Sequence, residues 1–464
     1  MRNRGQLLAA LLVLAGVIAS AVYLDREVGA RPLENVGVTG APSGVWLCPH
    51  GGGSKDWDVR IQLANPGSEP VPVRVRTITS AKPIPAEDHV VQPGSTLVIP
   101  VSGEARESST SVEYFGGFVS AGWITHAGGD ASGVAAEPCL PDSSRRWLLP
   151  DGTTADKTAD DYVVVMNPFA TDAVISLTLL SDRRDPVRTE EWTNVSLKPY
   201  HSRAFRLNDK EVGETTVSTV VDVSVGRVAA ATLGISTLGG IRSAVGLPAG
   251  ATTQILPGAA DAGRTDLTVM SAGLERVSLS GTSLGAAETA QPLAALADAA
   301  PGGESARTIP LTTGSPTTLV VQAAGPDVAF ARRTFGVTSD QASTSGATGP
   351  ADAWIVLPSV IGQPSHPAIV LANPGQEPTT LTLSALPAEG QSVPQPVTVE
   401  LPPMSTTLAP KTFVAGSSTS SVMILASSGT FVASSASYAL GREGYATFAV
   451  AMGVPIPAAW VPSS

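Results

Sequence analysis

The segment Leu63-Ala64-Asn65-Pro66-Gly67-Ser68-Glu69-Pro70 decides the architecture, because it returns as Leu371-Ala372-Asn373-Pro374-Gly375-Gln376-Glu377-Pro378 with seven of eight residues identical. The Asn-Pro pair also occurs at Asn167-Pro168, and Ser271-Ala272-Gly273 occupies the remaining position. Positions 65, 167, 271 and 373 are separated by 102, 104 and 102 residues. The chain therefore contains four copies of one repeat of about 102 residues.

Two further sequence markers occur in every copy at nearly constant distances from the first. A start marker precedes each asparagine position by 17 to 20 residues, at Trp46-Leu47-Cys48-Pro49, Trp147-Leu148-Leu149-Pro150, Gln254-Ile255-Leu256-Pro257 and Trp354-Ile355-Val356-Leu357-Pro358. A third marker, an apolar residue before proline, follows at Val91-Gln92-Pro93, Leu197-Lys198-Pro199, Ile309-Pro310 and Leu401-Pro402-Pro403. The shared phase of Trp46, Trp147, Trp354 and Trp460 predicts packing in a core or between repeats.

Apolar residues alternate on both sides of the Asn-Pro-Gly marker, which predicts strands with one buried face. The strand must end at the marker, because proline lacks the N–H that a ladder needs and glycine accepts a positive φ. We predict a hairpin in every copy and about seven strands per repeat, the size of an immunoglobulin-like β-sandwich. A β-propeller-like closed ring is the alternative. Helical periodicity is nearly absent, and the one candidate helix or loop is residues 292–300.

The start marker occurs a fifth time at Trp460-Val461-Pro462, with no repeat after it. We therefore expect each start strand to complete the sheet of the preceding repeat, so that the repeats form one stiff unit. The markers predict this division: 1–6 cytoplasmic, 7–24 a transmembrane signal anchor, 25–44 a stalk, and β repeats at 45–141, 146–249, 253–348 (degenerate) and 353–464.

The N-terminus predicts export. Arg2 and Arg4 precede an uncharged run of 18 residues from Leu7 to Leu24. As a helix this run would be roughly 27 Å long, close to the hydrocarbon thickness of a bilayer. The positive-inside rule places the arginines in the cytoplasm and everything after Leu24 outside. The alternative is a cleaved signal peptide, because Ala19-Ser20-Ala21 and Val28-Gly29-Ala30 resemble processing sites. Both readings export the remainder.

The chain has two cysteines, Cys48 and Cys139. In an oxidising compartment they should form a disulfide. Closing a loop of that length would stabilise the fold by roughly 4 to 5 kcal/mol. The alternative is a metal site made of Cys48, His50 and Cys139, but no fourth ligand has the usual spacing.

Charge and motif content exclude several activities. The net charge is −11 and the basic residues are scattered, which argues against binding to nucleic acid. Gly281-Thr282-Ser283-Leu284-Gly285 matches a hydrolase nucleophile elbow, yet no partner acid and histidine follow in a hydrolase context, so we interpret it as a Gly/Ser loop. We predict no catalytic residue, no cofactor and no metal site.

The histidines and paired acids give no stronger signal. The five histidines show no metal-ligand spacing and are interpreted as surface or turn residues; they are His50, His89, His126, His201 and His366. The acidic pairs near turns are interpreted as solvated loops rather than Ca²⁺ ligands; they are Asp56 with Asp58, Asp160 with Asp161, and Glu190 with Glu191.

Three tryptophans lie outside the repeat phase: Trp57, Trp123 and Trp192. Partial burial is the expected state of their rings, and an exposed ring at such a position could stack on a sugar or another ligand. A receptor would therefore present a pocket between repeats that is lined by these residues.

The order of Trp-x-x-Pro, Asn-Pro-Gly and a proline-initiated strand resembles a family of secreted or membrane-anchored actinobacterial proteins classed as a domain of unknown function. The resemblance covers nearly all of residues 45–464, and the third copy departs from it at Gln254 and Ser271. It implies tandem Ig-like surface modules and assigns no catalytic residue. The leading hypothesis is a non-enzymatic cell-envelope scaffold, anchored in the membrane, that binds an envelope protein or glycan. A glycan or ligand receptor and an envelope hydrolase are the alternatives.

Overall fold

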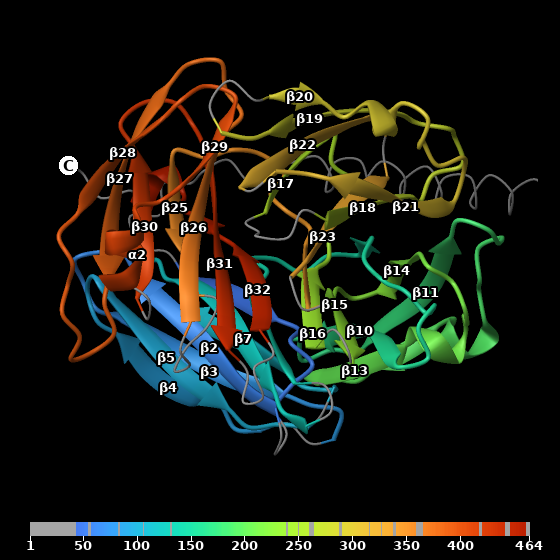
Figure 1. Ribbon diagram of the computed structural model, residues 1–464. Coiled ribbons are helices and arrows are strands. Elements are labelled where there is room, and N and C mark those ends of the chain that lie inside the picture. Colours follow the sequence, from blue (N-terminus) through green and yellow to red (C-terminus); the bar gives the residue numbers. More distant parts are fainter. Residues whose placement is uncertain are drawn as a thin grey trace, which may run out of the picture. The chain divides into compact units, whose positions relative to one another are not determined.

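The strands of each predicted repeat form two antiparallel sheets of their own in the computed structural model (Figure 1). The structure describes residues 43–464 except 54–56, 82–83, 105, 130–131, 238–239, 249, 259–263, 287–289, 315, 326, 337–339, 359–364, 417–419, 441–445 and 461–464. The predicted cytoplasmic segment and signal anchor therefore lie outside the described residues, as does nearly all of the stalk. No helix in the described part is long and apolar enough to cross a membrane.

We call the four pairs of sheets bodies 1 to 4. Body 1 consists of β1 (Gly44–Cys48), β2 (Trp57–Asn65), β3 (Val71–Ile78), β4 (Glu87–Val91), β5 (Ser95–Val101), β6 (Ser109–Tyr114), β7 (Ser120–Ala127) and β8 (Gly133–Pro138). Body 2 consists of β9 (Arg146–Leu149), β10 (Ala159–Asn167), β11 (Ala173–Ser181), β12 (Val195–Leu197), β13 (His201–Arg206), β14 (Val217–Val225), β15 (Ala229–Ser236) and β16 (Gly240–Val245), with short helices η2 (Glu190–Trp192) and η3 (Leu207–Asp209).

Bodies 3 and 4 repeat this order of strands. Body 3 consists of β17 (Thr253–Gly258), β18 (Arg264–Ser271), β19 (Ser278–Leu284), β20 (Gln291–Pro292), β21 (Ser305–Thr312), β22 (Thr317–Ala324), β23 (Val328–Phe335), β24 (Gln341–Thr344) and the short helix η4 (Ala294–Leu296). Body 4 consists of β25 (Ala353–Val356), β26 (Ser365–Asn373), β27 (Thr379–Leu386), β28 (Val397–Leu401), β29 (Ser405–Leu408), α2 (Lys411–Gly416), β30 (Ser421–Ala426), β31 (Val432–Leu440), β32 (Ala446–Met452), β33 (Val454–Pro455) and η5 (Ala458–Trp460).

The sheet topology confirms an all-β chain but corrects the immunoglobulin-like prediction. In body 1 one sheet has the order β1-β6-β3-β4 and the other β5-β2-β7-β8. The first two strands thus lie in different sheets, whereas an immunoglobulin fold places its first two strands in the same sheet. In the described residues each body has eight strands, with one more in body 4, instead of the expected number of about seven.

The Asn-Pro-Gly marker is a corner between sheets and not the predicted hairpin. β2 pairs with β5 and β7, while β3, directly after the marker, pairs with β4 and β6. Period-two alternation is the same for a hairpin and for a sheet-to-sheet corner, because both bury one face of each strand. The hairpin prediction was therefore wrong in its pairing, although the strand does end at the marker.

The asparagine side chain of each marker ties the corner together. Asn65 is fully buried. Its amide Nδ2 donates to the carbonyl oxygens of Glu69 at 2.8 Å and Val91 at 3.1 Å, and its Oδ1 accepts from the N–H of Gly67 at 2.9 Å. Asn167 and Asn373 make equivalent bonds in bodies 2 and 4. In each case one side-chain amide makes hydrogen bonds both to the corner and to the end of a strand in the opposite sheet.

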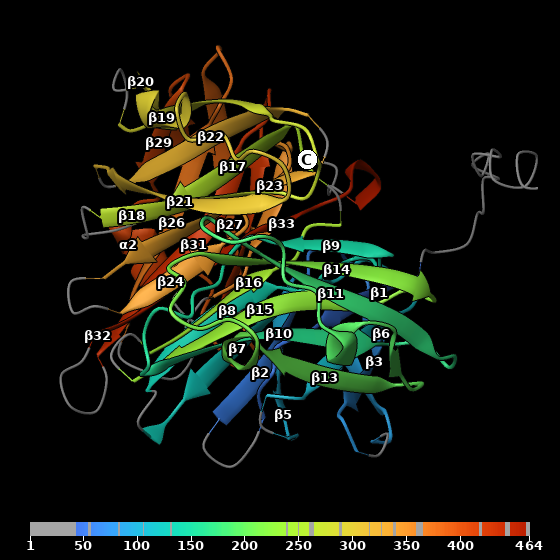
Figure 2. The same ribbon diagram turned by 90° about the vertical axis from the view of Figure 1, so that its right-hand side faces the viewer.

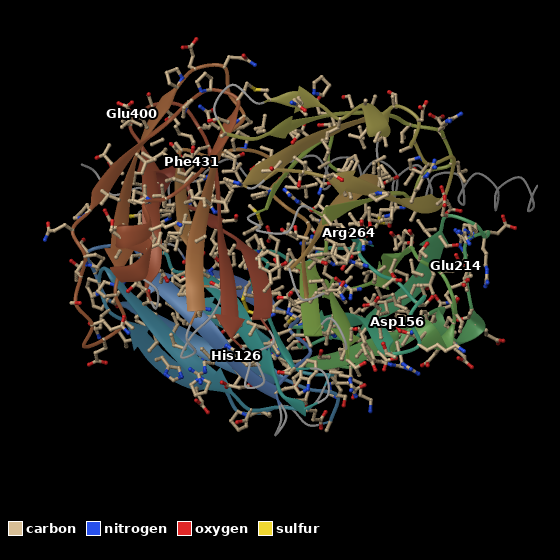
Figure 3. The ribbon with its side chains drawn as sticks, viewed as in Figure 1. His126, Asp156, Glu214, Arg264, Glu400 and Phe431 are labelled. Carbon is tan, nitrogen blue, oxygen red and sulfur yellow. A yellow bond between two sulfur atoms is a disulfide. The ribbon has the colours of Figure 1, made fainter. Side chains whose placement is uncertain are left out.

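The start-marker tryptophans lie in cores and donate to one equivalent carbonyl. Trp46 Nε1 donates to Val119 O at 2.7 Å, Trp147 Nε1 to Val228 O at 2.8 Å, and Trp354 Nε1 to Phe431 O at 2.8 Å. Phe431 lies among the core side chains of body 4 (Figure 3). Gln254 of body 3 replaces the indole by an amide that donates to Phe330 O at 3.0 Å. The third copy therefore keeps a donor where the ring is lost.

Start strands belong to their own bodies, which corrects the expectation of shared boundary strands. β1 pairs with β6, β9 with β14, β17 with β22 and β25 with β30. The end of each repeat returns to its own start strand, as in the bridge between Leu47 and Leu140 and the pairing of β25 with β33. Trp460, in η5, instead packs against a cluster that combines Trp46 of body 1 with Ile456 of body 4. This shared cluster joins body 4 to body 1.

The contacts between bodies form a closed cycle. β8 packs against β16, β16 against β24, β24 against β32, and β32 against β8 (Figures 1 and 2). A separate apolar cluster lies at each junction: Tyr162 and Leu233 between bodies 1 and 2, Leu180 and Met270 between 2 and 3, Val370 and Phe448 between 3 and 4, and Val134 and Ala449 between 4 and 1. The repeats therefore do not form a linear array, although each is a sandwich and not a single propeller blade.

The third marker of body 3 lies at Pro301-Gly302-Gly303 and not at the predicted Ile309-Pro310. Gly94, Tyr200 and Met404 follow the marker proline with φ values of 58°, 53° and 49°, and Gly303 has φ 72°. Ser95 Oγ donates to Gln92 O, Ser405 Oγ to Pro402 O, and Ser305 Oγ to Gly302 O. Ser305 is thus the equivalent of Ser95 and Ser405. Ile309-Pro310 lies inside β21.

Replacing Asn65 tests the corner. Asn65→Ala removes three hydrogen bonds at a buried site and is expected to cost about 2 to 3 kcal/mol of unfolding free energy. Asn65→Asp at pH 7 keeps the acceptor for Gly67 N–H but points a buried charge at two carbonyl oxygens, so it should cost more. Urea unfolding of both variants measures this. Equal or smaller destabilisation by Asp would contradict the assigned donor role.

Candidate functional site

Apart from the cysteines, the residues predicted from sequence do not form a site in the structure. Cys48 and Cys139 form the expected disulfide with an S–S distance of 2.03 Å, which excludes the alternative metal site with His50. Trp57, Trp123 and Trp192 are 8%, 1% and 6% exposed. Trp57 lies in the cluster between bodies 1 and 2, and Trp192 packs edge-on against Phe205 with ring centroids 5.8 Å apart. None of the three presents a ring face for stacking.

The nucleophile-elbow match has no catalytic geometry. Gly281, Thr282 and Ser283 lie within β19, which corrects the interpretation as a loop. Ser283 pairs with Leu319 and Gln291 in the sheet. A nucleophile elbow requires a sharp strand-to-helix turn, whereas Ser283 is the second-to-last residue of β19 and the next element is another strand, β20.

The histidines and acidic pairs show no metal-binding arrangement in the part of the chain that the structure describes. No group of His, Cys, Asp or Glu among the described residues could hold a metal ion. Asp58 pairs with Arg60, Asp160 with Arg206 and Glu191 with Lys210, while Asp56 and the side chain of His366 lie outside the described residues. His126, labelled in Figure 3, is mostly buried, and burial lowers its pKa.

His50 departs furthest from the expectation of surface histidines among those that the structure describes, since it is 1% exposed. Its Nε2 shares a hydrogen bond of 2.9 Å with Thr110 Oγ1, and its Nδ1 accepts from Gly52 N–H at 3.1 Å. Burial lowers the pKa of His50 to about 3. The ring is therefore neutral in the folded protein at ordinary pH.

Acidification should destabilise the protein through His50. Between the unfolded pKa near 6.5 and the folded pKa near 3, only the unfolded chain binds the proton. Stability should fall by roughly 1.4 kcal/mol for each pH unit in that window. His50→Gln keeps hydrogen-bonding capacity but cannot titrate, so its urea midpoint should depend less on pH between 7 and 4. Identical pH profiles for both proteins would contradict the assignment.

Three of the four junctions share one set of contacts, which we call the junction hydrogen bonds. They come from the second residue of the strand that follows the third marker. Thr96 N–H donates to Pro387 O at 3.0 Å, Ser202 N–H to Thr79 O at 3.1 Å, and Thr406 N–H to Gly285 O at 2.6 Å. The hydroxyls add Thr96 Oγ1 to Leu386 O at 2.6 Å, Thr406 Oγ1 to Leu284 O at 2.7 Å, and Ser202 Oγ with Ser109 Oγ at 2.8 Å. Bodies 1, 2 and 4 are thereby each bonded to the preceding body of the cycle.

The junction between bodies 2 and 3 lacks these bonds. The register of β18 with β21 places Ala306 at the position of Thr96, Ser202 and Thr406, and alanine has no hydroxyl. Within the described chain, no hydrogen bond joins Ala306 to Ser181, the residue at the equivalent end of β11. The two bodies instead share a hydroxyl contact of 2.7 Å between Thr216 and Thr308.

Ion pairs replace the junction hydrogen bonds at this junction. Arg333 pairs with Asp151 at 2.5 Å, Arg188 with Glu304 at 2.5 Å, and Arg146 with Asp327 at 3.1 Å. Among the described residues these are the ion pairs that cross from one body to another.

Asp151 also contacts Arg242 at 2.9 Å within body 2. Burial alone would raise the pKa of Asp151, but Arg333 and Arg242 hold it below its usual range. Glu137 of body 1 is also buried, and none of the described groups bonds its carboxyl oxygens. Burial, with the nearby Asp151 charge, raises the pKa of Glu137 well above its usual value. Asp151 therefore remains a charged acceptor for both arginines, whereas Glu137 favours the neutral form.

A groove lies at the same junction. It has a volume of about 690 Å³, and it is lined by the loop after β11 and by the segment that leads into β21. Ser181 and both neighbours of Ala306 belong to its lining. The groove therefore occupies the place where the other junctions have their hydrogen bonds. It is the candidate functional site, and sequence reasoning missed it because the signal is a single Thr or Ser to Ala change.

The loop between β11 and β12 is held to body 2 by Arg184. Its guanidinium pairs with Glu211 at 3.0 Å and Glu214 at 2.9 Å, and the side chains of both acids are nearly buried. Glu214 is labelled among the side chains of body 2 in Figure 3. This pairing fixes one wall of the groove and leaves the neighbouring residues, Arg183 and Asp185, exposed.

The comparisons with known proteins identify the family. The family of unknown function DUF5719 matches residues 115–353, just over half of the chain. The chain belongs to this family. No curated protein matches it at a significant level.

Two solved structures show only weak similarity to this DUF5719 chain. They are trypsin-activated alpha-2-macroglobulin from Escherichia coli, at 8% identity over 90% of this chain with a TM-score of 0.12, and a tetra-tandem repeat from the extending region of a large adhesion protein, at 10% identity over 85% of this chain and 93% of that one with a TM-score of 0.11. The chain spans 42% of the alpha-2-macroglobulin. The family gives no activity for the groove.

Removing one junction hydroxyl tests the cycle. Thr406→Val keeps the shape but leaves Leu284 O without its partner, which should cost about 1 to 2 kcal/mol of unfolding free energy. Thr382→Val, on an exposed position of β27, is the matched control and should change stability by less than about 0.5 kcal/mol. Thermal unfolding distinguishes the two. Equal effects would contradict a role for the junction hydroxyl.

Proposed function

We propose that this chain is a non-enzymatic cell-envelope protein whose four bodies form an extracytoplasmic interaction scaffold. The closed cycle of packed bodies is the observation that carries the proposal. Because every body contacts two others, displacing one body must break two interfaces, as expected of a stiff support. An enzyme would need a converging set of reactive side chains, and Ser283 lies near the end of β19, which is followed by another strand.

The proposed location rests on two features. The uncharged run from Leu7 to Leu24 has the length of a membrane span. The Cys48–Cys139 disulfide suits an oxidising compartment, where such bonds persist. We infer that Arg2 and Arg4 stay in the cytoplasm and that the bodies lie outside the cytoplasm. The resemblance implies that the bacterium is an actinobacterium.

A ligand receptor is the second candidate function, and the groove between bodies 2 and 3 favours it. The groove does not contain Trp57, Trp123 or Trp192. A receptor would therefore bind its ligand in this polar groove and not in the pocket predicted from the three tryptophans.

Thiol labelling in a bacterial host tests the location. The full chain should resist maleimide labelling after denaturation without reductant, because Cys48 and Cys139 are joined, and it should remain in the membrane fraction after carbonate extraction. Leu14→Arg interrupts the uncharged run and should leave both cysteines reduced and labelled in the cytoplasm. Reduced cysteines in the unaltered chain, or equal labelling of both proteins, would refute export.

A further inference from the structure

The groove between bodies 2 and 3 has the size of a ligand site. Its volume of about 690 Å³ falls within the range of roughly 300 to 1,000 Å³ that small-molecule sites occupy. It lies at an interface between bodies, a common place for such sites. Its walls come from two bodies that ion pairs hold together, so the site is complete only in the assembled chain.

The charged groups that line the groove divide into a paired and an unpaired set. The lining holds three arginines and three carboxylates: Arg183, Arg184, Arg307, Asp182, Asp185 and Glu304. Arg184 is engaged by Glu211 and Glu214, and Glu304 is engaged by Arg188.

The remaining four have no ion pair within the described chain. Arg307 donates only to the carbonyl oxygen of Asp298, at 3.3 Å. Two guanidinium donors and two carboxylate acceptors therefore stay open to a ligand.

Because the unpaired groups are two guanidinium groups and two carboxylates, the groove disfavours ligands with a net charge. An anion would be attracted by Arg183 and Arg307 but repelled by Asp182 and Asp185, and a cation would meet the opposite combination. An apolar ligand would offer these four charged groups no hydrogen-bond partner. A hydroxyl group both donates to a carboxylate and accepts from a guanidinium. A ligand with several hydroxyls satisfies both sets at once.

We propose that the groove between bodies 2 and 3 binds a neutral saccharide. Hydroxyls of the sugar donate to Asp182 and Asp185 and accept from Arg183 and Arg307. Pro186, which is partly exposed, supplies the apolar surface against which the sugar ring lies. This binding site goes beyond the scaffold function and does not depend on where the chain is located.

Saturation-transfer NMR on the purified full chain, in a detergent without a sugar headgroup, tests the proposal. The probes are cellobiose, maltose and N,N′-diacetylchitobiose, with glucuronate and glucosamine as charged comparators. At least one neutral disaccharide should receive saturation from the protein. Its dissociation constant should rise at least fivefold in Arg183→Ala and in Asp185→Ala, because each removes groups that bind sugar hydroxyls.

Arg276→Ala is the matched control, since Arg276 is exposed and does not line the groove. It should leave the dissociation constant within twofold. Near-ultraviolet circular dichroism checks that each variant is folded. The proposal is overturned if no neutral disaccharide binds, if only a charged comparator binds, or if neither lining variant weakens binding. Export can fail while sugar binding succeeds, so this result is separable from the thiol-labelling test.

Discussion

The asparagine side chain at the sheet-to-sheet corner is the interaction on which the sandwiches of bodies 1, 2 and 4 depend. A chain that leaves one sheet and enters the other must bury backbone groups that belong to neither ladder, and such groups are costly when unpaired. Asn65 has two donors and an acceptor, so a single amide serves the turn and the end of the facing strand. Serine has one donor. In body 3 the hydroxyl of Ser271 is buried, and none of the described groups bonds to it.

The closed cycle follows from small residues at the junctions. β8, β16, β24 and β32 approach one another through side chains such as Ala135, Ala342 and Ala449. Small side chains let strands from different bodies pack closely, while larger ones such as Tyr162 and Phe448 fill the space beside them. Each of these four strands lies at the edge of its sheet and is covered by strands of the neighbouring bodies. This packing removes an exposed edge that could pair with another molecule.

Much of the fold could be predicted from the sequence, but the pairing and the site could not. The repeat phase identified Trp46 and Trp147 as packing residues, because equivalent positions in a repeat share an environment. Alternation of apolar residues, however, reports only that a strand has a buried face, and it does not specify which strand lies beside it. Trp57 appeared to stand outside the pattern for a related reason. It packs between bodies, and contacts between bodies leave no period within one repeat.

The groove belongs to the copy that departs furthest from the repeat, and this association has a physical basis. Body 3 has Gln254 in place of tryptophan, Ser271 in place of asparagine and Ala306 in place of a hydroxyl residue. Gln254 keeps hydrogen bonds inside the body, whereas Ser271 loses those of the corner, and Ala306 lacks the hydroxyl that bonds one body to the next. Long charged side chains form ion pairs at this junction instead, as Arg188 and Glu304 show. The groove lies at the same place, and the charges that line it without an ion-pair partner are free to bind something other than protein. The loss of a junction hydroxyl at Ala306 and the polar groove beside it thus occur at the same place in the fold.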